Sequence, residues 1–472
     1  MEQNDQIFTI SGLARQIKDK EVSPVELLNT LLERVKKYEG KLNTFITVMS
    51  DIAKKQALKA ENEIMSGLYK GPLHGIPISI KDIISFAQIP LTNGSRVQPD
   101  YIPSTHATVT EKLLKSGAVI LGKAHLHEFA YKEPHPYYQW TKNPWDLNRV
   151  PGGSSSGSGA AVQAGLVLGS IGSDTGGSIR FPASFCGVVG LKPTYGRVSR
   201  YGVTPLSWSL DHIGPLTRTC EDAAIILASI AGYDEKDRAS FPRSDWDLKE
   251  FKKLDDLKGK KIGVPESFIF ENLGKDTERA FRSAITTLAE AGATLIPIEL
   301  KGMKELQFAQ TAILISEAYS YHMNHLESHS EGYNPRLRQS FEVGQFYSAA
   351  DYIQAQRCRK QMKEKFYEIF ENVDCIVTPT APDVAQKIEE YEKETSFTRG
   401  KFTYMANILG LPALSIPCGF SKENMPIGLQ IIGPSCHEGE VLSIGSVFEQ
   451  MNNYHKVMPD TSLWEEPAEF LT

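Results

Sequence analysis

The sequence has few cysteines, and they form no recognisable pattern. Its six cysteines are scattered over 472 residues without a C-x-x-C pair. In a chain of this length such cysteines are typically reduced and buried, because a disulfide framework needs a denser arrangement. The pattern argues against a disulfide-stapled secreted domain and favours the cytoplasm.

An excess of positive charge and long apolar runs are also missing. The 51 lysines and arginines are outnumbered by 57 aspartates and glutamates, which gives a formal net charge of −6. A nucleic-acid-binding surface usually needs the opposite balance. No stretch of 18 apolar residues is present, and the first ten residues, with Glu2 and Asp5, lack the order of a signal peptide. We therefore expect no direct nucleic-acid contact, no membrane span and a cytoplasmic location.

What the chain does contain is an alternation of predicted strands and helices. Ser23 before Pro24, with Glu26 and leucines at helical spacing, predicts a helix over 24–38, and a second helix is expected over 51–65. The segments 261–264, 277–291 and 294–298 predict a β-α-β unit. Other predicted elements are strands at 76–84, 118–122, 167–171, 375–378, 413–417 and 427–432 and a helix at 108–116. This alternation predicts an α/β fold with helices on both faces of a sheet.

The segment 151–193 is dense in glycine and serine but has apolar runs on both sides, which excludes a flexible linker. Gly176-Gly177-Ser178 follows a predicted strand and precedes a predicted helical turn. Successive backbone N–H groups from Thr175 to Ser178 could then converge on one point, as a tetrahedral intermediate requires. The pattern favours Ser178 as a nucleophile beside an oxyanion hole; a pair of purely structural turns is the alternative.

A serine nucleophile needs a base that accepts its proton. None of the eleven histidines stands in a recognisable triad context, whereas Lys81 lies within the apolar run 76–84. Burial lowers the pKa of a lysine by up to roughly 3–5 units, enough to leave it neutral near pH 7. A surface pair of Lys81 with Asp82 is the structural alternative. If Lys81 is the base, Asp82 must point away from it.

Three rival motifs point to other classes of protein. Residues 153–157 satisfy G-x-S-x-G, which would make Ser155 the nucleophile of an α/β-hydrolase. Residues 117–123 have P-loop spacing, but Ala124 stands where Ser or Thr should bind Mg²⁺. His125, His127 and Glu128 could bind a metal in a metal-dependent hydrolase, although two histidines at this spacing are more often packing residues. We expect no metal and no cofactor.

Several segments together resemble the amidase signature family. The resemblance covers 71–237 and extends more thinly to the C-terminus. It is carried by the motifs GPLHGIPISIKD (71–82), LLKSGAVILGKAHLHEFA (113–130), NPWD (143–146), PGGSSSGSGAA (151–161), SDTGGSIRFPASFCGVVGLKPTYGRVS (173–199), LGLPALSIPCGF (409–420) and MPIGLQIIG (425–433). The combination is specific, although no single motif would be.

The resemblance implies one domain over 1–472, with a large mixed, twisted sheet sandwiched between helices, a helical N-terminal arm at 1–65 and a signature core at 71–237. It implies that Ser178 forms an acyl-enzyme on a linear amide. Ser154, which follows a cis peptide bond in the family, would relay the proton to Lys81. The oxyanion donors would be Thr175, Gly176, Gly177 and Ser178.

The same family includes the A subunit of glutamyl-tRNA amidotransferase, which is the alternative to a free-standing amidase. That subunit typically carries an S-M-D-E-F-A-M-G-S-S-T-E-like run where this chain has AHLHEFAYKEPHP (124–136). It also carries an acidic residue two positions before a Phe-Thr pair, where this chain has Gly400 before Phe402-Thr403. Both departures argue against glutamine as substrate and favour the free-standing amidase.

The substrate itself is not specified by these motifs. We expect a small-molecule amide, with the acyl pocket lined by 129–140 and the region 307–359. Tyr131 and Tyr137 are candidate pocket residues, although packing would explain them equally well. Arg180 is a candidate for holding a substrate carboxylate, with an ion pair to Asp174 as its structural alternative. A homodimer is left open.

Overall fold

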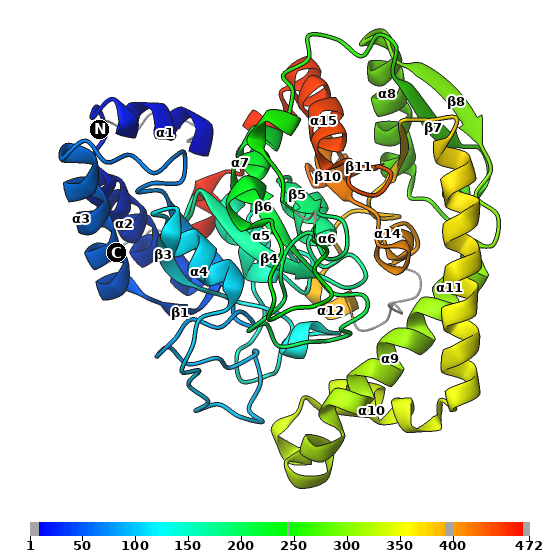
Figure 1. Ribbon diagram of the computed structural model, residues 1–472, viewed down its shortest axis with the longest axis horizontal. Coiled ribbons are helices and arrows are strands. Elements are labelled where there is room, and N and C mark those ends of the chain that lie inside the picture. The colour runs from blue at the N-terminus through cyan, green and yellow to red at the C-terminus, as the bar shows by residue number, and fades with distance from the viewer. Residues whose placement is uncertain (1–8, 243–244, 392–399, 466–472) are drawn as a thin grey trace, which may run out of the picture.

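The fold is built on one mixed β-sheet with helices against both faces (Figure 1). The computed structural model describes residues 9–242, 245–391 and 400–465, and within these the sheet has eleven strands. In sheet order they are β1 (Phe45–Val48), β3 (Val119–Ala124), β2 (Pro77–Lys81), β4 (Gly169–Asp174), β6 (His212–Thr217), β5 (Val189–Lys192), β10 (Ala413–Phe420), β11 (Pro426–Ile432), β9 (Cys375–Pro379), β7 (Lys261–Pro265) and β8 (Thr294–Ile298). Strand β2 runs parallel to β3 and β4, and β7 runs parallel to β8 and β9, whereas the central strands pair antiparallel. The predicted α/β fold with a mixed sheet is therefore confirmed.

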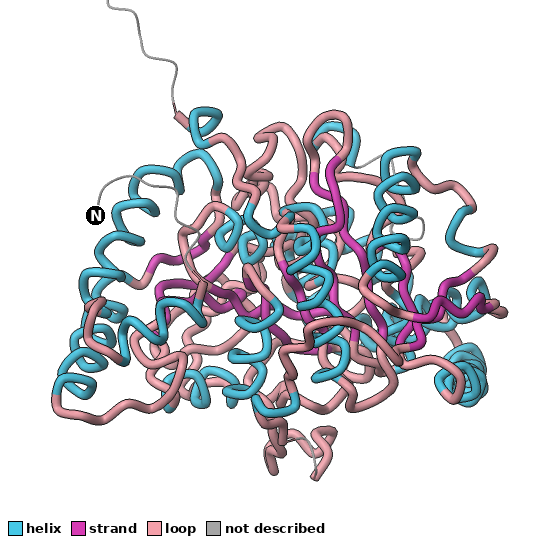
Figure 2. The backbone as a smooth tube through the Cα atoms, turned by 90° about the horizontal axis from the view of Figure 1, so that it is seen from above, coloured by secondary structure: helices cyan, strands magenta, loops and turns pink. Residues whose placement is uncertain are grey.

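Helices cover the sheet on two sides, as the view along its edge shows (Figure 2). The α-helices are α1 (Ile10–Lys18), α2 (Pro24–Leu42), α3 (Ser50–Met65), α4 (Thr108–Lys115), α5 (Ser156–Gln163), α6 (Arg180–Cys186), α7 (Cys220–Ile230), α8 (Lys275–Glu290), α9 (Met303–Ser328), α10 (Pro335–Glu342), α11 (Ala349–Phe370), α12 (Ile388–Tyr391), α14 (Tyr404–Leu409) and α15 (Glu438–Asn452). Helices α5 and α6 pack against the central strands, and α7 and α15 pack together against the same part of the sheet from the other side. The long helices α9 and α11 lie side by side at one end of the molecule (Figure 1).

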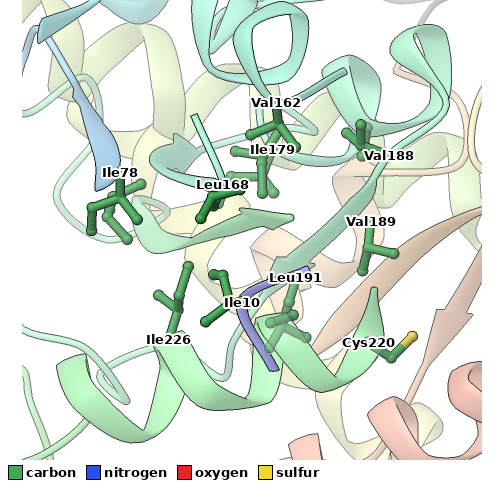
Figure 3. Packing of buried hydrophobic residues seen from close by; sticks show 14 of the residues in the cluster. Ile10, Ile78, Val162, Leu168, Ile179, Val188, Val189, Leu191, Cys220 and Ile226 are labelled. Carbon is green, nitrogen blue, oxygen red and sulfur yellow. The ribbon is translucent and has the colours of Figure 1, made fainter. Parts of the chain in front are cut away.

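The core around the central strands explains how the sheet is held between these helices. Val162 of α5 and Ile179 lie on one side of the strands, and Ile226 of α7 lies on the other with Ile10 of α1 (Figure 3). These side chains are at most 1% exposed. Burying each one stabilises the fold by about 1.5–3 kcal/mol relative to leaving it in water. The N-terminal arm thus contributes to the main core through α1.

Several predicted element boundaries need adjustment, among them three near the candidate site or the N-terminus. The first long helix begins at Pro24, with Ser23 Oγ accepting from two backbone N–H groups, but it continues to Leu42, which is fully buried. Strand β2 ends at Lys81, because a turn in which Ile84 N–H donates to the Lys81 carbonyl replaces the expected extension. Strand β4 ends at Asp174, later than expected. The predicted parallel β-α-β unit is confirmed as β7, α8 and β8.

No helix in the described part of the chain combines the length and apolarity that a membrane crossing requires.

Candidate active site

Lys81 is the last residue of β2 and has no exposed surface. Its Nζ lies 2.6 Å from Ser154 Oγ and 2.9 Å from Ser173 Oγ, within hydrogen-bonding distance of both. Burial lowers the pKa of Lys81 from 10.5 to about 7, because the ammonium loses hydration, and the charges of Asp174 and Asp211 oppose this only in part. A sizeable fraction of Lys81 is therefore neutral at pH 7.

Asp82 does not pair with Lys81. Its Oδ1 accepts from Lys123 Nζ at 2.5 Å, and its Oδ2 accepts from the hydroxyl and the backbone N–H of Thr92. The carboxylate thus points away from Lys81, as the requirement for a neutral lysine predicted. Lys123 and Asp82 form a fully buried ion pair of their own.

Two glycine- and serine-rich turns bring Ser154 and Ser178 into the same cavity. The peptide bond between Gly153 and Ser154 is cis. The backbone N–H of Ser155 donates to the carbonyl of Ser178 at 3.2 Å, which joins the two turns. Ser155 itself is fully buried, and its Oγ donates to the Ser173 carbonyl instead of lining the cavity. The G-x-S-x-G interpretation therefore finds no accessible nucleophile at Ser155.

Asp174 fixes the turn that carries Ser178. Its Oδ1 accepts from the backbone N–H of Gly177 at 2.7 Å, and its Oδ2 accepts from that of Ile179 at 3.0 Å. Of the four oxyanion donors that the family resemblance implies, Gly177 therefore already donates within the protein. The N–H groups of Thr175, Gly176 and Ser178 are left as candidate donors to a ligand.

Arg180 is fully buried and does not line the cavity, so the structure does not support its expected place in the substrate pocket. All five of its N–H donors are engaged. They donate to both oxygens of Asp174 and to Asn407 Oδ1, Gln430 Oε1 and the Thr403 carbonyl. The structural alternative, an ion pair with Asp174, is what the structure contains. Burial alone would raise the pKa of Asp174, but the charge of Arg180 outweighs it and keeps that pKa well below its usual range.

Residues that the sequence motifs did not single out hold the same turn from other sides. Gln310 Nε2 donates to the Thr175 carbonyl at 3.0 Å, and Thr403 Oγ1 donates to the Gly176 carbonyl at 2.6 Å. Asn407 Nδ2 donates to the backbone and side chain of Asp174. These partners lie 135 to 233 residues away in sequence. Local spacing carries no signal for such contacts.

The cavity at this site has a volume of about 300 Å³. Ser154 and Ser178 line it together with Thr175 and Gly176. Its remaining wall mixes aromatic, aliphatic and polar side chains, including Tyr131, Phe181, Phe185, Leu206, Gln307, Gln310, Leu314, Tyr391 and Tyr404.

The two tyrosines expected in the pocket differ in position. Tyr131 lines the cavity, whereas Tyr137 is 64% exposed and lies outside its lining, against Tyr138 and Arg96. Of the expected 307–359 segment, only residues of α9 between Gln307 and Leu314 line the cavity. The remainder of that segment forms the helices beyond it.

The residues of the rival metal motif have separate partners. His125 Nε2 donates to the Tyr138 carbonyl, and Glu128 accepts from Ser95 Oγ and from the backbone N–H of Asn334. Within the described ranges, no three His, Cys, Asp or Glu side chains are grouped as metal ligands would be. The geometry therefore gives His125, His127 and Glu128 no common centre.

The sequence matches the family model described as "Amidase" over residues 26–442. The chain therefore belongs to the amidase signature family, as its motifs indicated.

Two sequence relatives and two solved structures are similar to this chain over almost its whole length. The glutamyl-tRNA(Gln) amidotransferase subunits A of Sulfurihydrogenibium sp. and Acaryochloris marina are 39% and 40% identical, each over 96% of this chain and 99% of the relative. Among solved structures, the corresponding subunit from Thermotoga maritima has a TM-score of 0.80 at 34% identity, over 95% of this chain and 96% of that one. The native peptide amidase of Stenotrophomonas maltophilia has a TM-score of 0.83 at 29% identity, over 94% and 97%. The chain is thus similar over almost its whole length both to amidotransferase A subunits and to an amidase.

We expect Arg180→Lys to weaken catalysis without abolishing folding. Lysine keeps the charge but cannot reproduce five directed N–H donors, so acceptors around Asp174 lose their partners. The rate of amide hydrolysis should fall by roughly 10- to 100-fold, and the melting temperature should drop. Arg282→Lys, at a 59% exposed side chain on α8, is the matched control and should change neither. A parent-like rate in Arg180→Lys would contradict this account of the turn.

Proposed function

We propose that this chain is a serine-dependent amidase in which Ser178 attacks a carboxamide carbon, Ser154 relays the proton and Lys81 accepts it. One observation carries the proposal. A fully buried lysine contacts the hydroxyl of Ser154 at 2.6 Å, and Ser154 and Ser178 line one cavity. Burial gives Lys81 a pKa of about 7, which suits a base that works near neutral pH.

In the first half of the proposed reaction, Ser178 Oγ forms a bond to the carboxamide carbon. Its proton passes to Ser154 Oγ, whose own proton passes to Lys81 Nζ. The carbonyl oxygen becomes an oxyanion, which the N–H groups of Thr175, Gly176 and Ser178 would stabilise. Removing one such donor from a serine hydrolase typically costs about 10²–10³ in kcat.

In the second half, the C–N bond breaks as the electron pair leaves with nitrogen. The proton on Lys81 returns through Ser154 to that nitrogen, so that ammonia or an amine departs and an ester remains on Ser178. A water molecule then attacks the ester, with the same Ser154–Lys81 pair taking its proton. The carboxylate is released and Ser178 regains its hydrogen.

The similarity to relatives supports glutamine as the first substrate to consider. Two curated amidotransferase A subunits match almost the whole chain at 39% and 40% identity. In that role the chain would release ammonia from glutamine inside a complex with partner subunits and make no direct contact with nucleic acid itself. A cytoplasmic location fits this role.

A free-standing amidase for a linear amide is the second candidate, and the cavity wall favours it. Gly400 lines the cavity, so the acidic residue that A subunits carry at this point would have faced the substrate. In this chain that position offers no carboxylate to bind a substrate ammonium group. The similarity to the peptide amidase, a structural neighbour at 29% identity, also supports this second candidate. A homodimer stays a prediction for either role.

Ser178→Ala should abolish turnover while the protein stays folded. The variant lacks the atom that forms the ester, so kcat should fall by roughly 10⁴- to 10⁶-fold. A fluorophosphonate should label the parent protein at Ser178, as peptide mass spectrometry would detect. Labelling at Ser155 instead would overturn the assignment of the nucleophile.

Lys81 should determine the pH dependence. A base must be neutral, so kcat/KM should rise with pH through about 7, the folded-state pKa of Lys81. Lys81→Met should be severely impaired, and Lys81→Arg nearly as much, because a guanidinium does not release its proton. Lys363→Met is the matched control, since burial also lowers the pKa of Lys363, to about 8, but this lysine lies on α11 away from the cavity lining. A Lys81→Met enzyme with the parent pH profile would show that another group is the base.

The two candidate roles predict different substrates. As an amidotransferase subunit, the chain should release ammonia from glutamine, and more rapidly once partner subunits are added. As a free-standing amidase, it should hydrolyse small aliphatic or aromatic amides alone at higher kcat/KM than glutamine. Ammonia release from a panel of amides measures both, and Gly400→Asp, which returns a carboxylate to the cavity, should shift selectivity toward glutamine. Glutamine preference by the purified parent chain would exclude the second candidate.

A further inference from the structure

A second cavity of about 230 Å³ borders the segment that leads into the Ser178 turn, at Ser173 and Thr175. It shares Ala130, Thr175 and Leu206 with the first cavity. Its wall also includes Ser173, whose hydroxyl contacts Lys81, and the buried carboxyl group of Asp211. Thr175 therefore lines both cavities, and Asp211 lines the second.

Asp211 holds three donors from two segments of the chain. Its Oδ1 accepts from Thr175 Oγ1 at 2.6 Å. Its Oδ2 accepts from the backbone N–H groups of Leu206 and Ser207 at 2.9 Å and 3.0 Å. The Thr175 carbonyl is held separately by Gln310. The side chain and the carbonyl of Thr175 are thus both fixed, which limits the directions in which its N–H can point.

We propose that Asp211 is a positioning residue for amide hydrolysis: it holds Thr175 so that the Thr175 N–H faces the oxyanion, and its negative charge acts on Lys81. The inference rests on the proposed function, because it needs Lys81 as base and Thr175 as donor. It adds a carboxylate that none of the sequence motifs marked. Asp211 acts through its two neighbours and touches no substrate atom.

The charges around Asp211 come from several elements. Arg200 favours the ionised form of Asp211, and Glu317, which accepts from Ser207 Oγ, brings further negative charge close by. Lys81 on β2 is the cation on which Asp211 acts, together with Asp174 at the end of β4. Burial raises the pKa of Asp211 to about 6, although its hydrogen bonds with Thr175, Leu206 and Ser207 oppose the rise. Asp211 is therefore mostly ionised at pH 7.

The sign of the effect on Lys81 follows from that charge. A nearby carboxylate stabilises the ammonium form, and Asp211 raises the pKa of Lys81 against the lowering effect of burial. Asp211→Asn keeps the size of the side chain but removes the charge. The acidic limb of kcat/KM, which is its rise with pH as Lys81 is deprotonated, should then move to lower pH by about one unit, the size expected for the loss of one nearby opposite charge. The kcat should also fall by roughly tenfold because Thr175 is held less firmly.

Three further variants separate positioning from mere support of the fold. Thr175→Val removes the hydroxyl but keeps the carboxyl group of Asp211, so it should lower kcat and move the acidic limb less than Asp211→Asn does. Thr175→Ser keeps the hydroxyl and should restore most of the rate. Asp237→Asn, at another carboxylate on the second cavity that pairs with Arg200, should leave both kcat and the limb close to the parent values.

The decisive measurement is kcat/KM against pH for the parent enzyme, Asp211→Asn and Asp237→Asn, with active-site titration to count folded molecules. If Asp211→Asn is active and its kcat/KM rises with pH at the same pH as in the parent enzyme, the inference is overturned. A parent-like kcat in Thr175→Val would also overturn it. If Asp211→Asn fails to fold, the comparison of Thr175→Val with Thr175→Ser decides the positioning step alone. A parent-like profile in Lys81→Met would instead overturn the proposed function, so the two failures are distinguishable.

Discussion

The two carboxylate oxygens of Asp174 organise the part of the molecule on which the site depends. They accept hydrogen bonds from the backbone N–H groups of Gly177 and Ile179 and form an ion pair with Arg180. One side chain therefore fixes both the turn that carries Ser178 and the start of α6. Such a buried ion pair adds little net stability, because desolvation of both charges offsets their attraction. Its contribution is geometric: with every donor of Arg180 engaged, the turn around Ser178 has one arrangement. The position of Ser178 is consequently fixed by Asp174 and Arg180, two buried charged residues that do not line the cavity.

The position of Lys81 at the end of a buried strand determines its pKa. A lysine at the end of a central strand cannot reach water, and hydroxyl groups of Ser154 and Ser173 meet it instead of carboxylates. Hydroxyls can accept from an ammonium or donate to a neutral amine, so they suit both protonation states. The adjacent carboxylate, Asp82, is occupied by Lys123. Lys81 and Asp82 are thus neighbours in sequence, yet the carboxylate of Asp82 pairs with Lys123 of β3 and leaves Lys81 to the two hydroxyls.

Local sequence was enough to predict the helices and strands whose apolar residues recur at regular spacing, and the residues that lie on them. The β-α-β unit, the helix that begins at Pro24 and the position of Lys81 on a buried strand could all be predicted, because capping and apolar spacing are local properties. The pocket was harder. Arg180 and Tyr137 were expected on the pocket wall. Instead, Arg180 donates all its N–H groups to buried acceptors, and Tyr137 is largely exposed. The contacts of Gln310, Thr403 and Asn407 with the Ser178 turn were not predicted, because they join segments more than a hundred residues apart and depend on the completed fold.

Those distant contacts have a consequence for the order in which the protein becomes competent during synthesis. Asn407 and Thr403 hold Asp174 and the Gly176 carbonyl, but they leave the ribosome more than two hundred residues after the turn that they hold. A nascent chain that ends before α14 would contain Ser154, Ser178 and Lys81 and still lack the supports that fix the geometry between them. If Ser178 is the nucleophile that we propose, we expect it to be poorly positioned until α14 has been synthesised, and an N-terminal fragment without α14 should be inactive.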